Sequence, residues 1–408
     1  MIRSYDPEKD QKAVYRIWRE VGWIDNAKQE KFLDKIVKAG RSLVAEINDE
    51  AECFVLSAPA IFRYLNEDLA MSAVTAVTTS RIARKQGLAK KLTAHLIAAD
   101  AAEGALVSAL GIFEQGFYNL LGYGSGPYEH WISFDPAQLN VKKRARVPRR
   151  LTHDDSAQMH HAMLNRRRRH GAISLLPSET VEAELGWAEN GFGLGYFDGP
   201  NAELTHFFWA STKGEHGPFT IDMLAFQNGE QFLELLALLK NLGDQVRLVK
   251  MHEPSGIQMQ DFLIQPFRFR QLTEKSKYVN VNKATSYWQL RICDLAGCLE
   301  QTHLAGKPVR FNLNLRDPIT DFLDDDAPWR GIGADYIVTL GAECDVKVGQ
   351  DSSLPMLTAS VGAFSRLWMG TLPATGLAIS GGLDGPTELL ADLERILRIP
   401  EPKSDWDF

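Results

Sequence analysis

The most constraining feature of this chain is a stretch in which a β-branched strand runs into a basic turn that opens a helix. The strand expected over Ser72–Thr79 is followed by Arg84, Lys85 and Gly87, and the helix begins at Gly87. Backbone N–H groups at a helix N-terminus lack partners within the helix, and the helix dipole favours negative charge there. Gly87 and the small Ala89 let a large anion come close to the backbone. The stretch predicts an α/β fold with a pyrophosphate site; taken alone, it also fits a surface loop with incidental basic residues.

Around this stretch, the first 140 residues show the pattern of one mixed α/β unit. Asp6 suits the cap of a helix and Pro7 its first position, and apolar residues between Val14 and Val21 fall at i, i+3, i+4 and i+7. Further helices are expected at Lys28–Lys38, Gly87–Ala99 and Glu114–Leu121, and strands at Ser42–Ile47, Glu52–Ser57, Ala105–Leu110 and Tyr128–Phe134.

The composition changes after residue 140. Residues 141–150 are basic and contain a proline, as in a linker or an edge strand. The middle region, to about residue 285, again mixes helices and strands and is compatible with a diverged copy of the first; its helix over Glu230–Leu242 is apolar almost all round and is expected to be buried. The last region is expected to hold strands at Val309–Arg316 and Asp335–Leu340, helices at Ser360–Met369 and from Thr387, and a tail after Pro400 whose Trp406 and Phe408 favour docking.

Charge and cysteine content narrow the classes of function. The chain has 408 residues, with 45 basic against 52 acidic side chains and a net charge of -7, so no overall basic field attracts nucleic acid or an anionic membrane. A cationic substrate is easier to attract. The four cysteines form no CxxC pair, which favours a reducing cytoplasm and argues against a structural zinc site. The N-terminus does not resemble a signal peptide, and no segment resembles a membrane span.

Two motifs together indicate a family. Arg84-x-x-Gly87-x-Ala89 resembles the acetyl-coenzyme A signature of the GNAT N-acetyltransferases, R/Q-x-x-G-x-G/A. About thirty residues later, the segment 114–124, EQGFYNLLGYG, resembles the tyrosine helix of the same superfamily and the "GY" that follows it. One departure is Arg81, where many members have proline; it lies before the anion site.

The pattern of the whole chain resembles the Eis (enhanced intracellular survival) acetyltransferases. Residues 290–300 look like the entry to the sterol-carrier-protein-like domain of that family, and the ending Asp407-Phe408 is similar to its acidic residue followed by phenylalanine. The resemblance implies an α/β (α+β) fold. Its expected domains are a GNAT domain at 1–140, a second GNAT-like domain at 141–285, and a sterol-carrier-protein-like domain at 286–408 whose tail reaches the active site.

The resemblance also implies an activity. It is the direct transfer of an acetyl group from acetyl-coenzyme A to primary amines in a ternary complex, without a metal. The acceptors include aminoglycosides and protein lysine side chains. The family further implies a homo-oligomer, a hexamer. The charge and cysteine content described above predict a cytoplasmic protein with no nucleic-acid or membrane partner.

Site residues follow from the resemblance by position. Tyr118 is the implied general acid, and the α-carboxylate of Phe408 the implied general base. Asp25 and Asp407 are candidates for holding the substrate ammonium. The residues implied to bind acetyl-coenzyme A are Val77, Thr78 and Thr79 at the pantetheine arm, Arg84, Lys85, Gln86, Gly87, Leu88, Ala89 and Lys90 at the pyrophosphate, and Phe113 and Glu114 at the thioester.

Two other functions stay open at this point: a lipid or apolar-ligand binding protein that uses the C-terminal domain, and an acetyl-coenzyme A sensor without turnover. Other conspicuous groups favour structural interpretations. We expect Arg166–Arg169 to be a solvated face or an interface, Asp324–Asp326 a solvated loop, His160-His161 a poor metal pair, and Cys293 and Cys298 core thiols.

Overall fold

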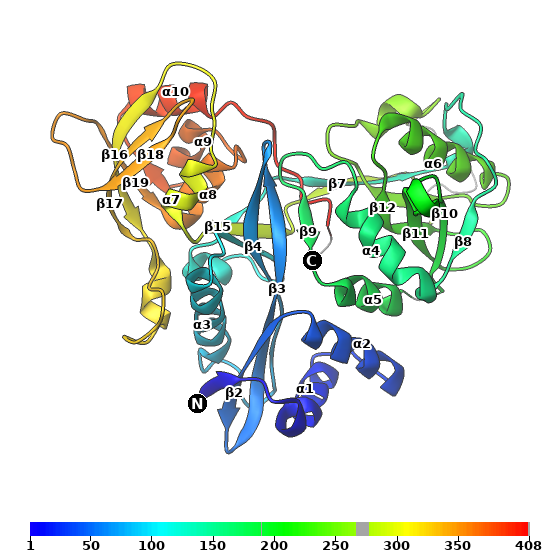
Figure 1. Cartoon of the computed structure of the whole chain (residues 1–408), viewed down its shortest axis with the longest axis horizontal. Helices are drawn as coiled ribbons and strands as arrows, with labels where there is room; N and C mark the ends of the chain where they lie inside the picture. Colours follow the sequence, from blue (N-terminus) through cyan, green and yellow to red (C-terminus); the bar gives the residue numbers. More distant parts are fainter. Residues whose placement is uncertain (189, 267–276, 407–408) are drawn as a thin grey trace.

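The computed structural model describes residues 1–188, 190–266 and 277–406, and these form three sheets with helices packed around them (Figure 1). Within these ranges every helix is too short or too polar to cross a lipid bilayer. The mixed α/β fold expected from the sequence is confirmed.

The first sheet is built largely from the N-terminal region. Its strands follow the order β1 (Ile2–Ser4), β2 (Arg41–Ile47), β3 (Glu50–Tyr64), β4 (Glu67–Thr79), β5 (Val107–Gly111), β15 (Trp288–Ile292) and β6 (Gly124–Ser125), with β9 (Ile173–Leu175) paired to β3. Its helices are α1 (Pro7–Glu20), α2 (Ala27–Lys38) and α3 (Leu88–Ala102).

The second sheet belongs mainly to the middle region. Its order is β14 (Asn282–Thr285), β7 (Glu129–Phe134), β13 (Val249–His252), β12 (Phe219–Ala225), β11 (His206–Thr212), β10 (Phe192–Tyr196) and β8 (Arg149–Leu151). Its helices are α4 (Ser156–Leu164), α5 (Ser178–Trp187) and α6 (Gly229–Asn241).

The third sheet belongs to the C-terminal region. Its order is β18 (Asp345–Val348), β17 (Ala334–Leu340), β16 (Val309–Arg316), β19 (Met356–Ser360) and β20 (Leu383–Asp384). Its helices are α7 (Leu295–Glu300), α8 (Val361–Trp368), α9 (Ala374–Ile379) and α10 (Thr387–Ile396).

The first and second sheets repeat one order of elements and exchange a strand. In each, an antiparallel hairpin (β3–β4 or β11–β12) leads through a helix (α3 or α6) to a parallel strand (β5 or β13). In the first sheet, the strand beside β5 is β15, which comes after the middle region in the sequence. In the second sheet, the strand beside β13 is β7, which comes from the end of the N-terminal region. The sheets therefore do not follow the expected division of the sequence into 1–140, 141–285 and 286–408, because β7 and β15 each join the sheet of another region.

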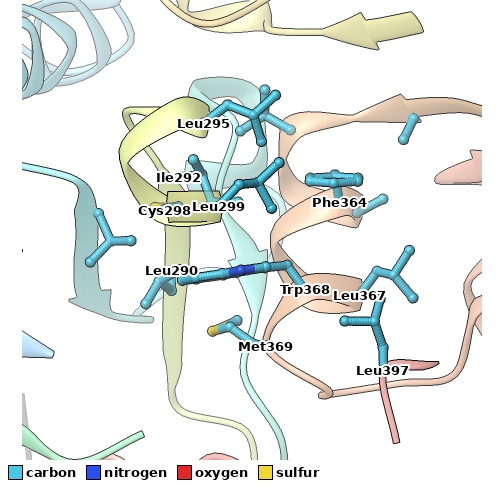
Figure 2. Packing of buried hydrophobic residues seen from close by; sticks show 14 of the residues in the cluster. Leu290, Ile292, Leu295, Cys298, Leu299, Phe364, Leu367, Trp368, Met369 and Leu397 are labelled. Atoms are coloured by element: carbon cyan, nitrogen blue, oxygen red, sulfur yellow. The ribbon is translucent and has the colours of Figure 1, made fainter. Parts of the chain in front are cut away.

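The third region packs on the first sheet through β15. Trp368 of α8 lies next to Leu290 of β15 and Met369 (Figure 2). Its ring stacks on Tyr64 of β3 with centroids 4.1 Å apart, and its Nε1 donates to the Thr302 hydroxyl at 2.9 Å. Trp368 is buried and joins the N-terminal and C-terminal regions in one core.

Local signals account for most elements. The Asp6 side chain accepts a hydrogen bond from the Glu8 N–H, and Pro7 is the first residue of α1, as expected. One expectation is wrong: the segment Glu114–Leu121 is helical only as a 3₁₀ turn at Tyr118–Leu121, called η1 below. Gly116 adopts a φ of +97°, outside the helical region, so a regular helix cannot pass through it.

Candidate active site

A cleft opens in the first sheet where two parallel strands part. β4 pairs with β5 only from Met71 to Val74. Beyond that point β4 carries a bulge, because the pairing with β3 shifts between Phe54 and Leu56 and Ala76 adopts a φ of +55°. β4 continues to Thr79 without a neighbour on the β5 side, so its backbone groups there are available to an extended ligand. The cleft has a volume of about 1060 Å³ and is lined from both strands.

The N-terminus of α3 forms part of the wall of this cleft. Gly87 precedes the helix with a φ of +78°, and it offers no side chain to cap the first N–H groups. No acidic residue lies in the first turn, and a Cβ on Gly87 would meet nothing within 4 Å. Arg84 and Lys85 in the preceding turn are exposed. These features make an open, positively charged site that fits a phosphate group.

The equivalent helix of the second sheet lacks such a site. The side chain of Asn228 caps α6 by accepting from the Gln231 N–H at 3.0 Å, and the first turn holds Glu230. The helix terminus is thus already satisfied and carries negative charge. Of the two repeated units, the first therefore holds the anion site.

Tyr118 lies at the inner end of the cleft, at the start of η1. Its side chain is 3% exposed and packs edge to face against Phe113, Phe117 and Tyr123, with centroids 4.9 to 6.1 Å away. Burial raises the pKa of Tyr118 above its ordinary value. The phenol of Tyr118, which lines the cleft, therefore keeps its proton at neutral pH.

The turn that carries Tyr118 is held by Arg291, which comes from β15. Arg291 donates to the Leu121 carbonyl, and its Nη2 lies 2.6 Å from Asp317. The Arg291 and Asp317 side chains are 0% and 1% exposed. A buried charge pair of this kind is costly to break, so it fixes the turn. The sequence gives no signal for this contact, because Arg291 and Leu121 are 170 positions apart.

A second cavity adjoins the cleft, and Trp131 of β7 lines both. This cavity has a volume of about 370 Å³ and lies beside β7, β12 and β13. It is called the acceptor cavity below, after the role that is proposed for it. Its ionisable wall residues are Glu129, Arg166, Arg167, Arg169, Glu184, Lys213, Asp222, His252, Glu253, Lys403 and Asp405.

The C-terminal tail docks against the acceptor cavity, as its aromatic residues led us to expect. The Ser404 N–H donates to Glu129 at 3.1 Å, and the Tyr287 hydroxyl donates to the Trp406 carbonyl at 2.7 Å. Arg166 binds both carboxylate oxygens of Asp405, at 2.8 and 3.1 Å. In Figure 1 the tail (red) leaves α10 and crosses toward β9. Asp407 and Phe408 lie outside the described residues.

Most of the residues expected to bind acetyl-coenzyme A come together in the cleft. The exception among them is Gln86, whose side chain donates to the Ile82 carbonyl at 2.9 Å and does not line the cleft. Asp25, a candidate for holding the substrate ammonium, is exposed and does not line the cleft either. The expected residues that line it are Val77, Thr78, Thr79, Arg84, Lys85, Gly87, Leu88, Ala89, Lys90, Phe113, Glu114 and Tyr118. Other wall residues, which the sequence did not indicate, come from the exchanged strands and the segments next to them; they are Trp131, Lys283, Thr285 and Tyr287.

Other groups singled out in the sequence have structural partners. Of the two interpretations of Arg166–Arg169, a solvated face or an interface, the solvated face does not hold for Arg166, which is buried against Asp405 of the docked tail. His160 contacts the Leu175 carbonyl at 3.0 Å, and Cys293 and Cys298 are buried thiols, as expected.

One cluster has the composition of a metal site. Asp198, His206 and Glu234 bring their ligand atoms within 4.8 Å of one another. The guanidinium of Arg146 lies 2.6 Å from Asp198 and 2.8 Å from Glu234, where a cation would otherwise be held. Within the described part of the chain, this cluster is therefore satisfied by an arginine.

Comparison with known proteins agrees with the geometry of the cleft. Residues 2–126 match the acetyltransferase (GNAT) domain, the region that contains β4, α3 and Tyr118. No curated protein sequence matches the chain.

Solved structures share the fold over nearly the whole chain. A probable N-acyltransferase from Enterococcus faecalis V583 has a TM-score of 0.78 at 16% identity, covering 98% of both chains. A GCN5-related N-acetyltransferase from Kribbella flavida has a TM-score of 0.74 at 17% identity, covering 100% of this chain and 98% of the other. Eis1 from Mycobacterium abscessus has a TM-score of 0.76 at 14% identity, covering 100% of both. The chain thus begins with a GNAT acetyltransferase domain, and the protein is an acyltransferase.

Proposed function

We propose that the protein is an acetyl-coenzyme A-dependent N-acetyltransferase of the Eis type that acts on primary amines. The observation that carries this proposal is one continuous cleft. It joins an uncapped, basic helix terminus at Gly87, an unpaired strand edge at Val77–Thr79 and a protonated phenol at Tyr118.

The cleft suits acetyl-coenzyme A from end to end. The pyrophosphate would lie on the first N–H groups of α3, with Arg84, Lys85 and Lys90 adding charge. The amides of the pantetheine arm would pair with the free edge of β4 at Val77–Thr79. The thioester would then lie at the inner end of the cleft, near Phe113 and Glu114.

The reaction is a direct transfer in a ternary complex. The amine nitrogen attacks the thioester carbonyl, and a backbone N–H near the β4 bulge stabilises the negative charge that develops on the oxygen. The carbon–sulfur bond breaks, and Tyr118 gives its proton to the departing thiolate. The proposed base is the α-carboxylate of Phe408, or a water that relays the proton to it. In support, the docked tail brings Trp406 to the wall of the acceptor cavity.

The amine would enter from the acceptor cavity, which meets the cleft at Trp131. Asp407 is retained as a candidate for holding its ammonium, whereas the exposed Asp25 is a weaker one. The resemblance to the Eis enzymes supports aminoglycosides and lysine side chains as acceptors. It also supports a cytoplasmic homo-hexamer and a sterol-carrier-protein-like fold for residues 286–408.

Thiol release tests the proposal. Purified protein is mixed with acetyl-coenzyme A and a panel of polyamines, aminoglycosides and lysine peptides, and free coenzyme A thiol is measured. Release that depends on the amine supports the transferase. Binding of acetyl-coenzyme A without release for any amine supports a sensor. Absence of binding, together with uptake of an apolar ligand, supports a lipid-binding protein.

A further inference from the structure

The four consecutive arginines 166–169 have different surroundings. They form an irregular segment between α4 and β9. Arg166 pairs with Asp405, and Arg168 binds both carboxylate oxygens of Asp68 at 3.0 Å. Arg167 and Arg169 line the acceptor cavity, and neither forms an ion pair with another residue of the described ranges. Arg166 and Arg168 are thus paired with carboxylates, whereas Arg167 and Arg169 line the cavity without an acidic partner among the described residues.

Arg167 is held in place without being compensated. Its backbone N–H donates to the Phe226 carbonyl at 2.7 Å, and its side chain is half-buried. Burial lowers the pKa of Arg167, and the positive charge of Arg169 lowers it further. Two like charges that share one wall repel each other, and partial removal from water adds to the cost. An anion between them would relieve both effects.

Carboxylates on the same wall already have partners of their own. Glu129 accepts from the Ser404 N–H, and Glu253 accepts from the Met259 N–H at 2.8 Å. Asp222 accepts from the Ser211 hydroxyl at 3.4 Å, and Asp405 is bound by Arg166. Lys213 also lines the cavity. Glu184 also lines the cavity, and a hydrogen bond from a neutral donor does not cancel the charge of a carboxylate. The wall therefore carries both signs of charge: carboxylates that already accept hydrogen bonds, and two arginines, Arg167 and Arg169, that have no acidic partner among the described residues.

The cavity can hold a small molecule with two polar ends. Its volume of about 370 Å³ is in the range of small-ligand sites. Trp131 lines both the cavity and the cleft, so the part of the cavity beside Trp131 is where the reacting amine is placed by the proposed transfer. The arginines form another part of the wall.

We propose that the acceptor carries an anionic group, a carboxylate or a phosphate, in addition to its amine, and that Arg167 and Arg169 bind that group. The inference rests on the acetyl transfer proposed above and narrows its acceptors, because it favours amines that also carry an anion over aminoglycosides and over lysine side chains without a neighbouring anion. Arg167 and Arg169 are then specificity residues, because they contact the non-reacting end of the acceptor.

Matched pairs of acceptors test this proposal. Nα-acetyl-lysine is compared with Nα-acetyl-lysine amide, and phosphoethanolamine with ethanolamine, by thiol release at saturating acetyl-coenzyme A and low salt. Within each pair the reacting amine is the same type and the anion differs. Charge-assisted hydrogen bonds contribute about 1.5–3 kcal/mol, so kcat/KM for at least one anionic member should be roughly 10- to 100-fold higher. The pair that shows the preference tells carboxylate from phosphate.

The double variant Arg167→Gln with Arg169→Gln should reduce this preference to about one. Arg168→Gln is the matched control, because Arg168 belongs to the same run but pairs with Asp68 outside the cavity; it should keep the wild-type preference. An unchanged KM for acetyl-coenzyme A shows that the double variant is folded. If the wild type turns over the uncharged member of both pairs as well as or better than the anionic member, the inference is overturned and the proposed transferase activity is unaffected. The same holds if the double variant keeps the wild-type preference for the anionic member. Absence of thiol release with every amine overturns the transferase and the inference together.

Discussion

At the scale of single residues, Gly87 has two separable properties. Its φ of +78° needs a residue that tolerates the left-handed region, and the space around its missing Cβ is open. Asparagine tolerates that conformation better than other side chains, whereas glutamate does not and also carries negative charge. The two substitutions therefore distinguish backbone strain from the electrostatics of a phosphate site.

Gly87→Glu should raise the KM for acetyl-coenzyme A at least tenfold, because it places a carboxylate at the helix terminus proposed to hold the pyrophosphate. Gly87→Asn should have a much smaller effect. Calorimetric titration with coenzyme A measures both. Wild-type affinity in the glutamate variant would remove the pyrophosphate from this turn.

Tyr118→Phe should keep the aromatic packing and remove the proton. Turnover should fall by ~10²–10⁴-fold, the usual contribution of a general acid, while acetyl-coenzyme A binding survives. Since burial raises the pKa of Tyr118, the wild type should also show no alkaline loss of kcat from this group between pH 7 and 10. Tyr123→Phe is the matched control, because Tyr123 is buried and bonds Ser108 at 2.7 Å without lining the cleft. If both variants lose turnover equally, Tyr118 is not the acid.

At the scale of elements, α6 packs on the second sheet through its apolar residues and is joined by charge to Arg146, in the segment that precedes β8. Arg146 donates to Glu234 of α6, and this lowers the pKa of the Glu234 carboxyl from 4.5 to about 2. A carboxyl whose pKa is lowered by folding stabilises the protein above its unfolded pKa, and the contribution is lost as the pH falls toward the folded value. The pair should therefore stabilise the fold at pH 7 and cease to do so between about pH 4.5 and 2.

Glu234→Gln should lower the free energy of unfolding at pH 7 by about 1–3 kcal/mol, because it weakens hydrogen bonds to a charged group. The difference from wild type should shrink as the pH is lowered through 4.5 toward 2. Glu230→Gln, on the exposed start of the same helix, is the control and should change stability by less than about 0.5 kcal/mol. Denaturant unfolding across this pH range measures the three proteins. A difference that does not change with pH would show that the charge of Glu234 is not what stabilises the contact.

Local elements could be predicted from the sequence because their signals are local. The Asp6 cap, the alternation over Val309–Arg316 and the turn at Gly87 each report on neighbouring residues, and α1, β16 and α3 form there. The proposed cofactor side of the cleft follows from the family resemblance, whose implied residues are concentrated within 77–118.

The acceptor side could not be predicted in this way. The contact of Arg291 with the Tyr118 turn, and that of Arg166 with Asp405, join residues 170 and 239 positions apart. The exchanged strands β7 and β15 have ordinary strand patterns, which do not say which sheet they join. Pairing across sheets is decided by the packing of the whole chain, which periodicity does not report.

At the scale of the whole molecule, the exchange of β7 and β15 makes the active site a product of all three regions. β4, α3, η1 and Trp131 come from the first region, Lys283 and Thr285 come from the middle region, and Arg291 enters from the start of the third. The tail then returns from the third region to the acceptor cavity. Changes in the tail should therefore affect chemistry at a cleft built mainly from the N-terminal region.

Asp405→Ala tests this coupling most directly, because it removes the ion pair that fixes the tail while Arg166 keeps its bonds to the Met163 and Ile173 carbonyls. If the tail carries the base, loss of its position should reduce turnover at least tenfold, since proton transfer tolerates little displacement. The affinity for acetyl-coenzyme A should stay within about twofold, because the anion site lies on α3. Glu401→Ala, at an exposed position of the same tail, should leave both unchanged. Thiol release and calorimetry measure these effects.

Tags at the two ends of the chain test the base itself. A C-terminal tag turns the Phe408 carboxylate into an amide and should reduce turnover as Asp405→Ala does, whereas an N-terminal tag should not. Equal turnover of both tagged forms would exclude the terminal carboxylate as the base, and full activity of Asp405→Ala would show that docking of the tail is structural.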